Sequence, residues 1–135
     1  MTETILIAAT DPNIVYLLQR YAEESGFQVV RSGQEKELLQ IAQQIQPILI
    51  VLQIEPPEAV WRQALQCLKS DPITGGIPVV AYSCFDEVMD SPIEGVAGIL
   101  QKSVLYSDFV LALERAGVPV DRSKQGNLNS ARKGI

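Results

Sequence analysis

The chain has no histidine among its 135 residues. Without an imidazole it cannot perform Ser-His or Cys-His catalysis, bind a metal ion through histidine, or carry a phosphoryl group on that side chain. It also has no Gly-x-Gly-x-x-Gly motif, which excludes the common dinucleotide-binding site. These absences remove the usual routes to catalysis, so we expect a protein that is not an enzyme and that binds no cofactor.

Cysteine is scarce, and the chain contains only Cys67 and Cys84. The two residues lack the close C-x-x-C spacing of metal sites and redox motifs. We interpret both as reduced, buried thiols of a cytoplasmic protein rather than as a disulfide or a metal site.

Long apolar runs are also missing, since the longest are far shorter than the roughly 20 residues that a membrane-spanning helix needs. The segment Met1–Thr4 carries no basic side chain, so we expect no signal peptide and a cytoplasmic location. Residues 1–120 contain 7 basic and 15 acidic residues, a balance of −8, whereas residues 121–135 contain 4 basic and 1 acidic, a balance of +3. The acidic body argues against direct contact with nucleic acid.

Short apolar segments recur along the chain and predict strands that are buried on both faces. They are residues 5–9, 27–30, 48–52, 78–82 and 98–100. Between them, apolar residues at helical spacing predict helices. The first helix is expected to begin at Asp11–Pro12 and to end at Gly26. The second is expected to begin in the capping box Ser32–Glu35 and to stop before Pro47.

Two further helices and one ambiguous segment complete the pattern. A helix after Pro56–Pro57 turns Val60, Trp61 and Leu65 inward, with contact to a partner as the alternative for Trp61. The last helix spans Ser107–Ala116. Residues 84–95 leave room for only a short helix.

Strands and helices that alternate in this way predict an α/β fold with a parallel sheet and helices on both faces. We expect a flavodoxin-like, doubly wound sheet with the strand order 2-1-3-4-5 over residues 1–118. Residues 119–135 are polar and are expected to form a flexible tail or linker. In such a sheet the functional crevice lies at the carboxyl ends of the strands.

Several segments in this order resemble the receiver domain of response regulators, from about residue 4 to residue 117. The first strand followed by Asp11–Pro12 is similar to the start of that family, and the run Pro47–Leu52 resembles its third strand. The segments Lys69–Pro72 and Ile77–Val80 resemble its approach to the fourth strand, and Leu100–Lys102 its approach to a functional lysine.

The resemblance implies a crevice in which carboxylates hold Mg²⁺ and one of them accepts a phosphoryl group. At the phosphoacceptor position the chain has Gln53, whose amide is not a carboxylate nucleophile. At the positions of the acidic pair it has Ala9 and Thr10, which leave too little negative charge for a metal ion. The chain is therefore identified as a degenerate, pseudo-receiver member of the family.

Other positions of the receiver pattern are partly kept. Ser83 and Lys102 match the hydroxyl and the lysine that contact the phosphoryl group in the family. Ile99 replaces the switch aromatic, and Ser103 replaces a proline. The stretch from Ser83 to Lys102 is roughly one helical turn short for the family, which implies a shortened or remodelled fourth helix.

Two side chains in the crevice have alternative interpretations. We favour Asp11 as a helix N-cap because Pro12 follows it, and the alternative is a remaining metal ligand that binds a cation together with Glu55. Gln53 is a candidate to hydrogen-bond either Lys102 or Thr10, and Lys102 either contacts the crevice or points into solvent.

We therefore expect a receiver-like signalling domain that acts by protein–protein interaction without Asp phosphorylation. Its partner is another protein or a second copy of the chain, bound through the fourth helix, the fifth strand and the last helix. The alternative is a phosphorylatable response regulator of a two-component phosphorelay with an atypical acceptor, for which Glu55 is the nearest carboxylate. A small-molecule site is disfavoured, because residues 9–13 contain no glycine for a flavodoxin-type phosphate loop and a cobalamin domain would need a histidine.

Overall fold

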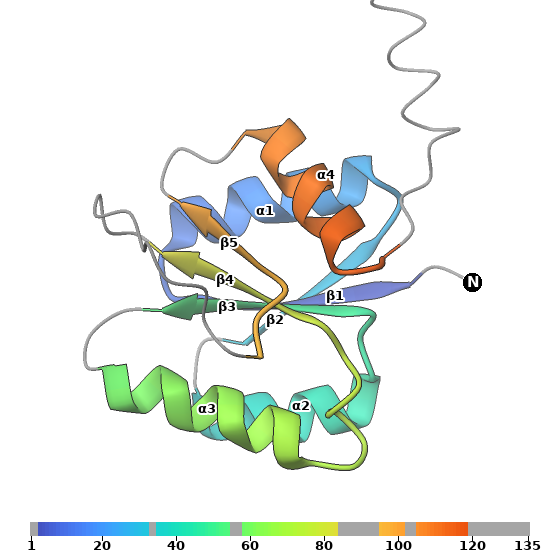
Figure 1. Ribbon diagram of the computed structural model, residues 1–135. Helices are drawn as coiled ribbons and strands as arrows, with labels where there is room; N and C mark the ends of the chain where they lie inside the picture. Colours follow the sequence, from blue (N-terminus) through green and yellow to red (C-terminus); the bar gives the residue numbers. More distant parts are fainter. Residues whose placement is uncertain (1–2, 33–34, 55–57, 84–94, 102–104, 119–135) are drawn as a thin grey trace, which may run out of the picture.

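The computed structural model describes residues 3–32, 35–54, 58–83, 95–101 and 105–118. Within these ranges parallel strands form one 5-stranded sheet in the order β2-β1-β3-β4-β5 (Figure 1). The strands are β1 (Thr4–Ala8), β2 (Gln28–Ser32), β3 (Leu49–Ile54), β4 (Val79–Ser83) and β5 (Gly98–Gln101). The flavodoxin-like order predicted from the sequence is confirmed.

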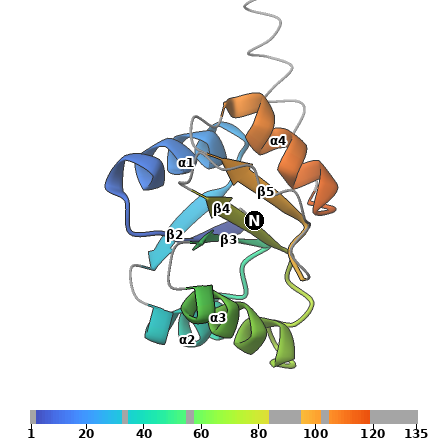
Figure 2. The same ribbon diagram turned by 60° about the vertical axis from the view of Figure 1, so that its left-hand side comes forward.

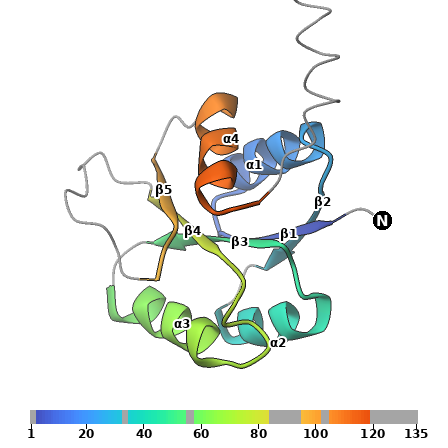
Figure 3. The same ribbon diagram turned by 45° about the vertical axis from the view of Figure 1, so that its right-hand side comes forward.

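Helices cover the sheet on both faces. In the described residues they are α1 (Pro12–Glu24), α2 (Glu35–Ile45), α3 (Glu58–Ser70) and α4 (Tyr106–Arg115). Helices α1 and α4 lie on one face and helices α2 and α3 on the other, as the views in Figures 1, 2 and 3 agree. The shortened helix expected in segment 84–95 falls almost wholly outside the described residues and stays a prediction.

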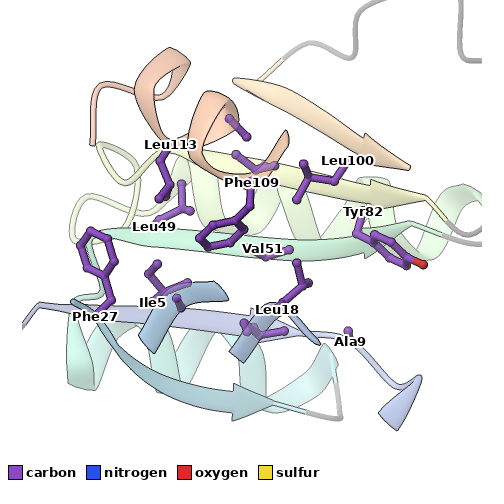
Figure 4. Packing of buried hydrophobic residues seen from close by; sticks show 14 of the residues in the cluster. Ile5, Ala9, Leu18, Phe27, Leu49, Val51, Tyr82, Leu100, Phe109 and Leu113 are labelled. Atoms are coloured by element: carbon purple, nitrogen blue, oxygen red, sulfur yellow. The ribbon is translucent and has the colours of Figure 1, made fainter. Parts of the chain in front are cut away.

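Strand β3 is the centre of the core, because all of its 6 residues are buried. Successive side chains of a strand point to opposite faces. Leu49 and Val51 accordingly pack into the apolar cluster under α1 and α4, and Ile50 and Leu52 into the cluster under α2 and α3. Figure 4 shows Val51 among side chains that include Phe109 of α4.

Helix α1 begins and ends at the residues that the sequence indicated. Asp11 is its N-cap, with Pro12 in the first turn, and Gly26 beyond its C-cap has a φ of 93°. Its buried stripe contains Ile14, Val15 and Leu18. Burial of an aliphatic side chain of this size contributes roughly 1.5–3 kcal/mol, so the stripe fixes α1 firmly on the sheet.

Helix α4 is attached to α1 by an aromatic cluster. The ring of Tyr21 makes an edge-on contact with Tyr106, with ring centroids 5.6 Å apart, and a tilted contact with Phe109 at 5.9 Å. The hydroxyl groups of Ser25 and Tyr106 lie within hydrogen-bonding distance of each other, 3.2 Å apart. The last turn of α1 and the first turn of α4 therefore pack as one layer.

Strands β3 and β4 both end later in the sequence than predicted. β3 runs to Ile54 instead of Leu52, so that Gln53 lies inside the strand, and β4 ends at Ser83 instead of Tyr82. The two extensions pair with each other, since Gln53 is in register with Tyr82 and Ile54 with Ser83. Mutual pairing satisfies the backbone groups of both segments, which explains why polar residues continue the apolar runs.

Strand β2 extends beyond the residues that the sequence predicted. Ser32 is its last residue, where it is in register with Ala8 of β1, and α2 is assigned from Glu35. The predicted capping box Ser32–Glu35 includes residues 33–34, which lie outside the described residues, so it stays a prediction. The predicted stop before Pro47 is confirmed, because α2 ends at Ile45.

Helix α3 buries a narrower face than expected. Trp61 is only 5% exposed, which confirms it as a core residue. Val60 is 39% exposed and Cys67 is exposed, so the predictions that both are buried are wrong. These two residues lie outside the stripe of Trp61, Leu65 and Leu68, which packs with Ala64 into the cluster under α2 and α3. Cys84 lies outside the described residues.

None of the helices in the described ranges combines the length and the apolar character needed to cross a membrane.

The loop between α3 and β4 is organised by Asp71. One carboxylate oxygen accepts hydrogen bonds from the backbone N–H groups of Ile73, at 2.8 Å, and Thr74, at 3.2 Å. The other accepts from the side-chain amide of Gln43 in α2, at 2.6 Å. The bond from Ile73, with smaller contributions from Gln43 and Thr74, lowers the pKa of Asp71 below its ordinary value.

Because the pKa of Asp71 is lower in the folded protein, its carboxylate stabilises the fold above the pKa of the unfolded chain, and this stabilisation is lost as pH falls through the folded pKa. We expect Asp71→Asn to have a lower Tm than the wild type at neutral pH, with a difference that shrinks toward about pH 3. Thermal melts across this pH range measure it. A difference in Tm that stays constant with pH would contradict the stabilising role of the Asp71 carboxylate.

Candidate functional site

The crevice lies where the carboxyl ends of the central strands meet. Ala8 at the end of β1 is in register with Leu52 of β3, and Gln53 is in register with Tyr82 of β4. Figure 4 shows Ala9 and Tyr82 toward this end of the sheet, the end to which the strand arrows point. Such an edge is where parallel α/β sheets place their functional groups.

Gln53 is the central side chain of this edge. It is 8% exposed, and its Oε1 atom accepts a hydrogen bond of 2.8 Å from the backbone N–H of Thr10. Of the two hydrogen bonds that the sequence left open for Gln53, the one with Thr10 is therefore present. The bond joins β3 to the connection between β1 and α1 and satisfies the amide oxygen in a buried environment.

The connection between β1 and α1 supplies no free carboxylate to the crevice. Ala9 is 8% exposed and contributes a methyl group, and Thr10 is exposed. The carboxylate of Asp11 accepts a hydrogen bond of 2.9 Å from the backbone N–H of Asn13, which is the N-cap geometry. The N-cap interpretation of Asp11 is confirmed.

No group of three or more Cys, Asp or Glu side chains that could hold a metal ion is found in the part of the chain that the structure describes. Glu55, the other candidate carboxylate, lies outside it. In the described part of this edge, the amide of Gln53 and the methyl group of Ala9 are buried, and Thr10 is exposed.

Two of the remaining predicted site residues, Ser83 and Ile99, lie on β4 and β5. Ser83 is 2% exposed and ends β4, in register with Gln101 of β5. Ile99 of β5 is partly buried and packs against the cluster under α2 and α3. Lys102 and Ser103 lie outside the described residues, so their contacts stay predictions.

Tyr82 also lies at this edge, although the sequence predicted it only as part of a strand. It is 3% exposed and lies beside Gln53 on the neighbouring strand. The signal that could have identified it was its position as the last residue of an apolar run next to Ser83. Only the register of β3 against β4 shows that Tyr82 and Gln53 are neighbours.

Comparisons with known proteins point to one kind of domain. No protein-family profile matches the chain. The polar-differentiation response regulator DivK of Brucella ovis is 29% identical over 85 residues, which are 63% of this chain and 69% of that protein. A putative response regulator from Chloroflexus aurantiacus has a TM-score of 0.75 and 18% identity over 86% of this chain and 98% of its own. The chemotaxis protein CheY4 of Vibrio cholerae has a TM-score of 0.73 and 16% identity over 86% and 99%.

The relatives and the fold support the response-regulator receiver family. A receiver-domain role in signal transduction is supported with it, since the matched curated protein is a response regulator. Within a receiver domain the edge formed by β1, β3 and β4 is the crevice that the resemblance associates with phosphoryl transfer. The described part of this crevice carries Gln53, Ala9 and Thr10, none of which is an acid.

The cap at the start of α1 can be separated from a metal-binding role by substitution. We expect Asp11→Ala to destabilise the protein by about 1 kcal/mol, because the Asn13 N–H loses its acceptor. Asp11→Asn keeps an acceptor oxygen and should stay close to the wild type. Urea unfolding with and without Mg²⁺ measures both effects. Stabilisation of the wild type, but not of Asp11→Asn, by Mg²⁺ would contradict the N-cap assignment.

Proposed function

We propose that this receiver-like domain transmits signals by protein–protein interaction without phosphorylation of an aspartate, and that it is a pseudo-receiver rather than an enzyme. The observation that carries the proposal is the state of Gln53, a neutral amide that is buried and already hydrogen-bonded to Thr10. An amide offers no carboxylate nucleophile for phosphoryl transfer. The neutral neighbours Ala9 and Thr10 supply no ligand charge for Mg²⁺.

Phosphoryl transfer therefore lacks two independent requirements, a nucleophile and a metal site. Phosphoryl transfer in this type of site relies on a metal ion to position the group and to neutralise its charge. Replacing Gln53 by an acid would restore the nucleophile but not the metal site. Restoring carboxylates beside β1 would restore metal ligands but not the nucleophile.

The second candidate is a phosphorylatable response regulator with Glu55 as the atypical acceptor. One observation favours it: β3 extends to Ile54, so that Glu55 directly follows the strand. We place it second because a single carboxylate beside a neutral crevice still lacks partners for the metal ion.

The partner is a protein, and a second copy of the chain is the partner that can be tested directly. The proposed contact surface comprises segment 84–95, β5 and α4. Leu105 before α4 is 62% exposed and Leu111 in α4 is 45% exposed, and exposed leucines of this kind favour a protein contact. The acidic body, −8 over residues 1–120 from 7 basic and 15 acidic side chains, argues against direct binding to nucleic acid.

Phosphoryl labelling tests the loss of chemistry. With acetyl phosphate and Mg²⁺ we expect no stoichiometric incorporation in the wild type or in Gln53→Asp, because neither protein has enough carboxylates to bind the ion. Intact-mass spectrometry measures the product, with Glu55→Gln as the matched control for the second candidate. Incorporation in the wild type that disappears in Glu55→Gln would establish the second candidate instead. Incorporation in Gln53→Asp would contradict the expected lack of a metal site.

Sedimentation velocity of the full chain tests the proposed surface. We expect Leu105→Ser and Leu111→Ser each to weaken self-association by roughly tenfold, because each removes a buried leucine from the interface. Ile73→Ser is the matched control, since Ile73 is 50% exposed but lies in the loop after α3. Equal weakening by all three substitutions, or a chain that stays monomeric at high concentration, would refute the homodimer.

A further inference from the structure

We infer that Gln53 is a positioning residue that holds the connection between β1 and α1 against β3 by a neutral hydrogen bond. The inference rests on the proposed function, because a domain that signals by contact alone needs a fixed surface without a bound cation. The hydrogen bond of Gln53 fixes the crevice without a cation. The connection comprises Ala9, Thr10 and Asp11.

The geometry of the bond suits a structural link. It joins residues 43 apart in the sequence, and its acceptor belongs to a side chain that is 8% exposed. The bond length of 2.8 Å is at the short end of the range for an N–H donor and an oxygen acceptor. In a site that is screened from water, breaking the bond would leave a buried amide oxygen without this donor, which is unfavourable.

Because of the position of its donor, the bond also affects how α1 packs against α4. Thr10 immediately precedes Asp11, the N-cap of α1, so the bond fixes the residue from which the helix starts. Because α1 is a continuous helix of 13 residues, the position of its first turn also sets the position of its last turn. There Tyr21 and Ser25 contact Tyr106 in the first turn of α4. A displacement of the connection would therefore have to be accommodated in the packing of α1 against α4.

The length and the charge of glutamine both suit this role. Aspartate at the same position is shorter by one methylene group, so its oxygens would not reach the Thr10 N–H from an unchanged β3. Glutamate has the length of glutamine and keeps an acceptor oxygen whether it is ionised or protonated. Methionine has a similar length and volume but no comparable acceptor. These three replacements distinguish the effect of losing the hydrogen bond from the effect of changing the side-chain volume.

Hydrogen exchange of the Thr10 amide, followed by NMR on the full chain, tests the inference. In the wild type we expect this amide to be protected, with the same rate in the presence and absence of Mg²⁺. In Gln53→Met and Gln53→Asp we expect its exchange to accelerate by about fivefold or more, and in Gln53→Glu to stay within about twofold of the wild type. The Gln28 amide, which donates to the Glu3 carbonyl at 2.9 Å, is the internal control for an intact sheet.

The possible results separate this inference from the proposed function. A Thr10 amide that exchanges freely in the wild type, or that stays protected in Gln53→Met with an intact Gln28 signal, overturns the positioning role. Either result leaves the phosphorylation-independent function standing. If Gln53→Met loses the Gln28 protection as well, Gln53→Asp and the wild-type rate decide the matter. Phosphoryl labelling of the wild type would refute the proposed function but not the bond between Gln53 and Thr10.

Discussion

The burial of β3 between two layers of helices is the constraint on which the rest of the structure depends. Every residue of this strand is buried, and it pairs with β1 on one side and β4 on the other. Five of its six residues are aliphatic and need no polar partner. Gln53 is the exception, and burial requires that its amide be hydrogen-bonded. The bond from Thr10 meets this requirement for the oxygen and at the same time fixes the neighbouring connection.

The same constraint favours a neutral side chain at residue 53. A carboxylate in so buried a position is costly unless cations or several donors surround it. In a working receiver the metal ion supplies that positive charge. With Ala9 and Thr10 beside it, an acid at residue 53 would lack the other ligands that hold such an ion. An amide avoids the cost, because it is uncharged and can both donate and accept. The uncharged residues Ala9 and Thr10 beside β1 and the amide at residue 53 are thus mutually consistent.

The order of the elements could be predicted from the sequence because each signal was local. Apolar runs located the five strands, and the Asp11–Pro12 pair located the start of α1. The ends of the strands were predicted less well, because tertiary pairing extends a strand beyond its local pattern. Ser32 continues β2 past the predicted end at Val30, since Ala8 of β1 lies beside it. Gln53 reads as the residue after a strand but lies within one, because Tyr82 pairs with it.

The site could be predicted only in part, for the same reason. The positions of Gln53, Ala9 and Thr10 followed from the strand ends, because parallel strands bring their carboxyl ends to one edge. The partner of Gln53 did not follow, since Thr10 and Lys102 were equally reachable on sequence grounds. The contribution of Tyr82 was also hidden, because the register between two strands depends on the packing of both faces.

The neutral hydrogen bond of Gln53 also limits what can alter the conformation of the crevice. In a crevice lined by acids, a cation or a phosphoryl group shifts the balance between two arrangements because it binds them unequally. Here the link between β3 and the β1–α1 connection is internal to the chain and uncharged. This neutral bond itself offers no charge to a small ion. Under the proposed function, a partner would shift the arrangement by contact at the surface, where α1, which follows this connection, packs against α4. The proposed function therefore relies on contact with partners instead of on phosphoryl groups.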